Sequence, residues 1–381
     1  MRERIYLEFL RYCLDGTSTL PESSNKINWM EMIDWAESHA IVGVVYGGIS
    51  DGRSQREDGR SLLHISFEDL MEWVSYAQYI EEQNKLVNLR CVEIVDEFRN
   101  DGFDCVVLKG QGNALMYPNP LLRTSGDIDL WLMPKSDGGC KKDDVREIIR
   151  YVRSKNPEGK TVYHHIDYGL YKDVEVEVHY RPSFLNNLIA NRRLQRFLMS
   201  EGSKTEEVDL PDGAGKIAVP SWTFNVVFQL SHIYRHFIQS GLGLRQMIDY
   251  FYLLKTNTNL QLDGVNGTNN TNIPELLKRL GLMEIAGAVM WVLKEVLGLD
   301  ERYLIAPVDE RRGQFLFDEI MEGGNFGMGM RSDAGWLSAD TAIGRNFLRL
   351  KRDMKLVRYF PSECLWEPIF RLWHFGWRMV Y

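Results

Sequence analysis

Two aspartates placed two residues apart, Asp127 and Asp129, are the strongest candidates for chemistry in this 381-residue sequence. They lie in residues 125–132, SGDIDLWL, where a turn leads into a run with the periodicity of a β-strand. Alternate strand side chains share a face, so both carboxylates should point the same way, opposite Ile128 and Leu130. Neighbouring carboxylates repel each other unless a cation lies between them, and a divalent cation with oxygen ligands meets that need. The pattern therefore predicts a metal site.

A glycine-containing loop precedes the acidic pair. It follows a predicted strand at 103–108, leads into a predicted short helix at 113–117, and consists of Lys109, Gly110, Gln111 and Gly112. Glycines allow backbone N–H groups to approach phosphate oxygens, and a helix N-terminus adds positive potential. Lys109 would meet a phosphate as a point charge, while Arg123, Thr124 and Ser125 offer further donors just before the acidic pair. These features predict a phosphate-binding loop.

A third carboxylate is expected from the predicted strand at 174–180, in which the valines at 174, 176 and 178 alternate strictly with polar side chains. Glu175, Glu177 and His179 share the polar face, and either glutamate could join the aspartates. Three carboxylates from two strands would hold one or two Mg²⁺ (or Mn²⁺) ions that bridge nucleotide phosphates and an attacking oxygen. We expect His179 to support a carboxylate rather than to bind the metal.

The elements that must position these residues indicate three parts. Helical periodicity at 29–40 and 67–98 predicts a helical N-terminal region, residues 1–100, which Asn100-Asp101-Gly102 would end. Residues 101–220 should form an α/β core with a mixed sheet of four or five strands. Its predicted elements are the strands at 103–108, 127–132, 161–166 and 174–180 and a helix at 144–154.

Residues 221–381 are predicted to form a C-terminal helical domain, with helices at 222–238 and 244–255. Arg245 and Asp249 lie one turn apart on the second of these helices, and would either face a nucleotide or stabilise their own helix. The predicted fold class is thus α+β, with a small mixed sheet between N-terminal and C-terminal helical regions.

Composition limits the partners and the compartment. The formal net charge of −8 argues against a long nucleic acid as a partner. The five cysteines show no CxxC or zinc-like spacing, which favours a reducing, cytoplasmic location. The N-terminus lacks the features of a secretory signal, and no uncharged apolar run reaches the length of a membrane span, so no transmembrane segment is expected. The sequence does not indicate an oligomeric state.

Histidines and C-terminal aromatic residues offer weaker signals. His164 and His165 are adjacent, so we expect them on opposite faces of their strand. His232 and His236 lie one helical turn apart, but without the HExxH pattern a zinc site there is the less favoured interpretation. The aromatic residues of 365–381 suit a buried closing helix better than a membrane interface.

The motifs together resemble a known group. Residues 106–132, VVLKGQGNALMYPNPLLRTSGDIDLWL, resemble the signature of the uncharacterised nucleotidyltransferase family, within the DNA polymerase β-like nucleotidyltransferase superfamily. The similarity extends to VEVHYR at 176–181, to His232 and His236, to GLRQMID at 243–249, and more faintly to YFP at 359–361.

The resemblance implies roles for particular residues. Asp127 and Asp129 would bind the metal ions, and Glu177 would be the third carboxylate and would accept or orient the proton of the acceptor. From the loop, the donors before the acidic pair and the helix at 244–255, the residues expected to bind the nucleotide are Lys109, Gly110, Gln111, Gly112, Arg123, Ser125 and Arg245. One departure is evident: the superfamily usually has serine after the loop glycine, whereas Gln111 follows Gly110.

The implied activity is a two-metal nucleotidyltransferase that moves a nucleoside monophosphate from an NTP to an acceptor and releases pyrophosphate. Because the chain is acidic, we expect the acceptor to be a small molecule, a sugar or a protein side chain. The alternative is a catalytically inactive nucleotide-binding or scaffold protein with the same fold, for which the Gln111 departure is the motive.

Overall fold

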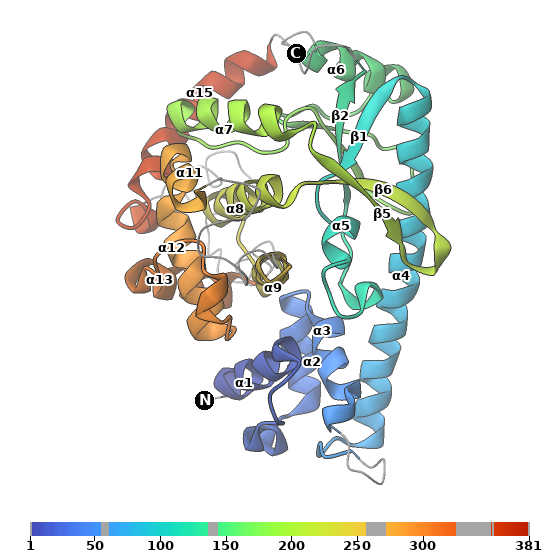
Figure 1. The fold of residues 1–381 in the computed structure, drawn as a ribbon, viewed down its shortest axis with the longest axis vertical. Helices are drawn as coiled ribbons and strands as arrows, with labels where there is room; N and C mark the ends of the chain where they lie inside the picture. Colours follow the sequence, from blue (N-terminus) through green and yellow to red (C-terminus); the bar gives the residue numbers. More distant parts are fainter. Residues whose placement is uncertain are drawn as a thin grey trace, which may run out of the picture.

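The computed structural model describes residues 2–54, 61–135, 144–256, 272–324, 352 and 354–379. A small mixed sheet lies between helical regions, which confirms the predicted α+β class (Figure 1). The helices before the sheet are α1 (Arg2–Asp15), α2 (Trp29–Ser38), α3 (Val42–Ser50) and α4 (Phe67–Asn100). The core elements are β1 (Phe103–Val107), α5 (Gln111–Ala114), β2 (Ile128–Pro134), α6 (Asp144–Lys155), β3 (His165–Asp167), β4 (Val176–His179), α7 (Leu188–Glu201), β5 (Thr205–Leu210) and β6 (Gly215–Pro220).

The C-terminal region is helical, as predicted. Its α-helices are α8 (Trp222–Gln239), α9 (Leu244–Lys255), α11 (Ile273–Leu280), α12 (Met283–Trp291), α13 (Glu310–Gly323) and α15 (Pro361–Arg378), and a π-helical turn, η5 (Val292–Val296), follows α12. Short 3-10 turns lie at η1 (Glu22–Lys26), η2 (Gly52–Ser54), η3 (Pro120–Leu122), η4 (Pro211–Gly213) and η6 (Glu301–Tyr303).

The sheet has four strands in the order β1-β2-β4-β3, with β2 and β4 parallel and the two outer pairs antiparallel. Asp129 on β2 stands opposite Glu177 on β4, and Glu177 stands opposite Asp167 on β3. Because paired residues on adjacent strands share a face, three carboxylates form one row across the sheet. A separate hairpin pairs β5 with β6; the sequence had not indicated these two strands.

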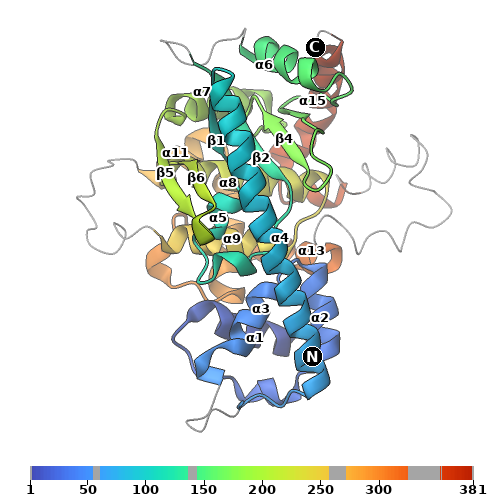
Figure 2. The same cartoon turned by 90° about the vertical axis from the view of Figure 1, so that its right-hand side faces the viewer.

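The long helix α4 connects the N-terminal helices with the sheet, and Figure 2 shows it running from one to the other. The Ser66 hydroxyl caps its first turn by accepting a hydrogen bond from the Asp69 N–H. Its end at Asn100 is followed by Gly102 at φ +94°, a conformation that glycine adopts without strain. Trp73 is buried against the N-terminal helices, whereas Phe98 is buried against the sheet.

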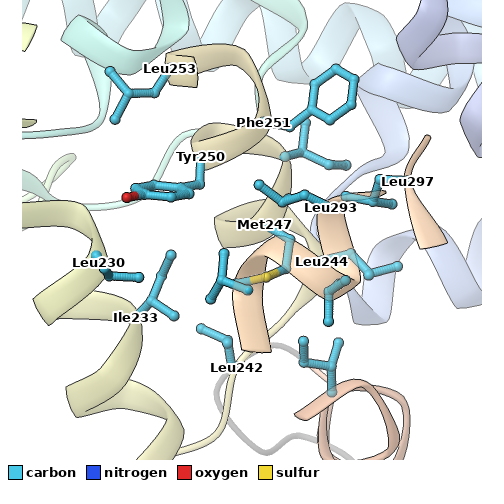
Figure 3. Close-up of a cluster of buried hydrophobic side chains, with 14 of the residues drawn as sticks. Leu230, Ile233, Leu242, Leu244, Met247, Tyr250, Phe251, Leu253, Leu293 and Leu297 are labelled. Carbon is cyan, nitrogen blue, oxygen red and sulfur yellow. The ribbon is translucent and has the colours of Figure 1, made fainter. Parts of the chain in front are cut away.

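Helices α8 and α9 are fixed by a buried apolar cluster (Figure 3). Leu230 and Ile233 of α8 pack with Met247 of α9 and Leu293 of η5, and all four side chains are almost fully buried. Such packing holds side chains on the opposite faces of both helices in place. Those faces carry residues that reach the sheet.

The closing helix α15 is partly buried. Phe370 packs against Tyr163 and Phe184, which agrees with the predicted closing role. Leu372 and Phe375 remain 77% and 64% exposed, however, so one apolar side of the helix is open to solvent.

Two global expectations can be compared with the described residues. Cys13, Cys91, Cys105 and Cys364 are free thiols, while Cys140 lies outside the described residues. Within the described part of the chain, no helix combines the length and the apolar character needed to cross a bilayer.

Candidate functional site

Three carboxylates, those of Asp127, Asp129 and Glu177, lie near the start of β2. The Leu108 N–H donates to the Asp129 carbonyl at 3.0 Å, which ties the end of β1 to the acidic segment. The Asp129 side chain is fully buried, whereas those of Asp127 and Glu177 are 31% and 28% exposed. One carboxylate is thus held deep in the sheet and two open outward.

Lys109 joins the two aspartates. Its Nζ lies 3.0 Å from Asp129 Oδ2 and 3.9 Å from Asp127 Oδ2, which confirms that both carboxylates share a face. Burial raises the pKa of Asp129, but the charges of Lys109 and His179 outweigh that effect and hold it below its ordinary value. Burial and repulsion from Asp129 raise the pKa of Asp127. The pair is therefore an acidic site partly neutralised by one ammonium group.

His179 joins Asp129 to Glu177. Its Nε2 lies 2.9 Å from Asp129 Oδ1 and 3.3 Å from Glu177 Oε2, and its Nδ1 lies 3.4 Å from the Arg181 carbonyl. Burial lowers the pKa of His179, but the two carboxylates raise it above its ordinary value overall. Both ring nitrogens face acceptors, so the imidazolium form fits the site. The expectation that His179 supports a carboxylate agrees with this geometry.

His165 lies on the other side of Glu177. Its Nδ1 is 2.8 Å from Glu177 Oε2. The rings of His164 and His165 lie 4.4 Å apart, centroid to centroid, and each lies within 5.4 Å of the His179 ring. The prediction that His164 and His165 point to opposite faces is therefore wrong, because β3 begins only at His165 and His164 precedes the regular alternation.

The glycine loop turns sharply into α5. Gly110 adopts φ +61°, a left-handed conformation that favours glycine. Gly112 packs closely on Val219, because a Cβ at this position would lie 3.0 Å from the valine Cγ1. The buried Gln111 side chain donates to Asn88 on α4, so it faces the core. The predicted helix at 113–117 instead begins at Gln111.

Arg123 is part of a buried clamp behind the site. Its Nε and Nη2 donate to the two carboxylate oxygens of Asp249, each at 2.8 Å, and the Tyr117 hydroxyl donates to Asp249 Oδ1 at 2.6 Å. Burial raises the pKa of Asp249, but Arg123 outweighs it and holds the pKa below its ordinary value. The clamp fixes η3 to α9. Arg123 Nη1 has no hydrogen-bond partner among the described residues.

Arg245 holds the segment that precedes Asp127. Its Nη1 donates to the carbonyls of Thr124 and Ser125 at 3.0 and 3.5 Å. Ser125 itself is half-buried. Arg245 and Asp249 lie on the same helix, but the carboxylate binds Arg123 and the guanidinium binds the loop, so each of the two residues serves the site region rather than only α9.

A cluster on α8, missed by the sequence analysis, completes the surroundings. Arg235 donates from Nη2 to His232 Nδ1 at 3.2 Å and lies 3.3 Å from His236 Nε2, while its Nη1 contacts His164. His232 Nε2 is 3.5 Å from Lys109 Nζ. The His232–His236 pair therefore contacts cations, and within the described residues it is in none of the groups with metal-ligand spacing. The only available signal was an arginine between two histidines on one helix.

Three cavities border the carboxylates. A small one of about 40 Å³ lies among Lys109, Arg123, Asp127 and Arg245. One of about 290 Å³ adjoins residues 124–127, and one of about 790 Å³ adjoins Glu177. Lys109, Arg123 and Arg245 thus line the small cavity with Asp127, whereas Glu177 lines the cavity of about 790 Å³.

A family model described as "Uncharacterised nucleotidyltransferase" matches residues 25–298, and the chain belongs to this family. The resemblance seen in the sequence is therefore confirmed, although residues 359–361 lie beyond the match.

Other comparisons are more distant. Among solved structures, the crystal structure of an antigenic nucleotidyltransferase-like protein from Paracoccidioides brasiliensis is 14% identical in sequence, with a TM-score of 0.35. The match covers 61% of this chain and 97% of that one. No curated protein matches the sequence.

Proposed function

We propose that the protein is a nucleotidyltransferase that depends on Mg²⁺ (or Mn²⁺) and moves a nucleoside monophosphate from an NTP to an acceptor, with release of pyrophosphate. The single observation that carries this proposal is the group of three carboxylates, with Asp129 in register with Glu177 and Asp127 on the same face as Asp129. Family membership supports transferase chemistry of this class.

The side chains fit the metal ions that this activity requires. Asp127, Asp129 and Glu177 offer only oxygen atoms, the ligands that Mg²⁺ and Mn²⁺ prefer. Asp129 Oδ2 is buried and already faces the Lys109 ammonium at 3.0 Å, so this oxygen lies where a positive charge is accommodated. In this proposal the three carboxylates hold the ions, which would neutralise charge on the transferring phosphate.

The cationic side of the site suits the triphosphate. Lys109 is already placed by both aspartates, and Arg245 holds the loop before Asp127. We assign the phosphates to Lys109, the backbone of residues 110–112, Ser125 and Arg245. Arg123 contributes through its clamp on Asp249, and its Nη1, which has no partner among the described residues, is the nitrogen left for a phosphate.

The acceptor is assigned to the side of Glu177, where the cavity of about 790 Å³ has the size of small-molecule sites. This volume and the net charge of −8 favour a small molecule, a sugar or a protein side chain over a long nucleic acid. Glu177 stands at the cavity wall, so it is placed to accept or orient the proton of the acceptor hydroxyl.

Nucleotide binding by calorimetry and pyrophosphate release test the proposal. The Asp127→Asn/Asp129→Asn double variant should lose Mg²⁺-dependent NTP binding. Asp104→Asn, an exposed position on β1, is the matched control and should bind like the wild type. The proposal fails if the wild type with Mg²⁺ binds no NTP, or if the double variant binds it equally well.

Gln111 gives a specific reason to keep a second candidate, a nucleotide-binding or scaffold protein without turnover. Glutamine has no hydroxyl to donate to a phosphate, and its side-chain amide is turned away to donate to Asn88. Metal-dependent NTP binding without pyrophosphate release across a broad panel of hydroxyl acceptors would favour this candidate. Release with any acceptor would exclude it.

A further inference from the structure

We propose that His165, Asp167 and Glu177 form a second cation site that takes a transition-metal ion such as Mn²⁺, Co²⁺ or Zn²⁺ in preference to Mg²⁺. This site is additional to the one assigned to Asp127 and Asp129, with Glu177 common to both. It does not depend on nucleotidyl transfer being the activity of the protein.

The strand pairing places the three residues together. Asp167 on β3 stands directly opposite Glu177 on β4. His165 precedes Asp167 by two residues on the same strand, so both side chains project from the same face. The antiparallel pair of β3 and β4 thereby presents one imidazole and two carboxylates on one face of the sheet.

The distances agree with a shared ion. One ligand atom from each residue lies within 4.8 Å of the other two. His165 Nδ1 is 2.8 Å from Glu177 Oε2, so the imidazole nitrogen and the carboxylate oxygen face each other directly. His165 Nε2 is 3.5 Å from Asp167 Oδ1, and Asp167 is 47% exposed, so its carboxylate has room to turn. The three groups therefore lie close enough together to share one ion.

The ligand types determine which ion the site would prefer. Imidazole nitrogen is a good ligand for Zn²⁺, Co²⁺ and related ions, whereas Mg²⁺ strongly prefers oxygen. The Asp127–Asp129 pair has only oxygen ligands and already contacts Lys109, whose ammonium lies 3.0 Å from Asp129 Oδ2. Adjacent strands are about 4.8 Å apart, so Asp167, two strands from Asp129, belongs to a separate position.

The cavity beside Glu177 indicates what such an ion would bind. His165, Asp167 and Glu177 all line the cavity of about 790 Å³. An ion held by three protein ligands keeps coordination positions for an external oxygen, as open catalytic sites do. The site would therefore bind an oxygen-bearing molecule, such as an alcohol, carboxylate or phosphate, in this cavity.

Two spectroscopic titrations of the full chain test the proposal. Co²⁺ should develop visible d–d absorption that excess Mg²⁺ does not remove, and pulsed EPR of bound Mn²⁺ should show coupling to an imidazole nitrogen. His165→Gln should abolish the nitrogen coupling and weaken Co²⁺ binding by more than about tenfold. His64→Gln, an exposed histidine, is the matched control and should change neither.

Asp167→Asn provides a second variant at a half-exposed position, and it should weaken Co²⁺ binding without loss of the fold. Asp127→Asn separates this site from the proposed function, because it should impair NTP binding and leave the Co²⁺ absorption intact. The proposal is overturned if wild-type protein shows no Co²⁺ band that resists Mg²⁺. It is also overturned if nitrogen coupling survives His165→Gln and disappears only in His179→Gln.

Discussion

Replacing Lys109 by methionine tests how the buried aspartate is stabilised. The ammonium lies 3.0 Å from Asp129 Oδ2, and the Asp129 side chain is fully buried. Methionine keeps most of the side-chain volume and removes the charge. We expect Lys109→Met to lower the stability of the protein in the absence of divalent cations, because a buried carboxylate loses its closest cation.

The magnitude follows from the surroundings of Asp129. Removal of one partner of a buried ion pair costs about 3–5 kcal/mol. His179 Nε2, 2.9 Å from Asp129 Oδ1, remains as a second cation. We therefore expect the lower part of that range, about 3 kcal/mol, which corresponds to a decrease in Tm of roughly 6–12 °C at the scale measured for mid-sized domains.

Differential scanning calorimetry with and without MgCl₂ or MnCl₂ is the assay. A cation held by Asp127 and Asp129 would replace the missing charge, so added metal should raise the Tm of Lys109→Met more than that of the wild type. Lys85→Met is the matched control, because Lys85 pairs with Glu82 at the surface and should lose little stability.

Two results would refute this reasoning. An unchanged Tm for Lys109→Met without metal would mean that the ammonium does not stabilise Asp129. A large loss of stability that no divalent cation restores would mean that the two aspartates do not hold an ion.

Three further predictions concern other parts of the chain. Arg123→Met should destabilise the protein by about 3–5 kcal/mol because it leaves Asp249 buried without its bidentate partner, and Arg123→Met/Asp249→Leu should recover part of this loss, as measured by denaturant unfolding. Gly110→Ala should cost about 1–2 kcal/mol because φ is +61°, and should weaken NTP binding if Lys109 is displaced; calorimetry measures both. Burial raises the pKa of Glu363 to about 7, so the folded protein binds this proton more tightly than the unfolded chain. The resulting stability is fully present below the unfolded value near 4.5 and is lost as the pH rises through 7, a change of about 3 kcal/mol that Glu363→Gln should remove from the dependence of Tm on pH.

Each of these predictions has a contradicting result. Equal stability of Arg123→Met and the wild type would exclude a stabilising clamp. A Gly110→Ala variant with unchanged Tm would show that the loop relaxes out of its left-handed conformation. If Glu363→Gln and the wild type show the same change in Tm between pH 5 and pH 8, Glu363 is not the titrating group.

Local features of the fold and of the site could be predicted from the sequence. Strand alternation is a property of the backbone, so Asp127 and Asp129 were expected on one face, and the contacts of Lys109 with both confirm it. The helix that became α4 was predicted from its periodicity and its Asn100-Asp101-Gly102 stop. The assigned roles of the site residues remain predictions.

Tertiary structure decided what lies beside these residues. The register that sets Asp129, Glu177 and Asp167 in one row depends on how three strands pair, and pairing follows from packing across the whole core. The orientation of Gln111 also depends on a non-local contact. Its buried side chain donates to Asn88 on α4, which lies 23 residues away in the sequence.

The contacts of the histidines and of Arg235 also depend on tertiary packing and could not be predicted from the sequence. Two adjacent residues alternate only inside a strand, and β3 proved too short to include His164, so both rings came to lie beside His179. Arg235 reached that cluster from α8, whose position is determined by apolar contacts on its opposite face. The sequence by itself determined the acidic strand, its glycine loop and the family, because these are local patterns. Only the folded chain decided the carboxylate row and its histidine neighbours, because non-local packing sets strand register and helix position.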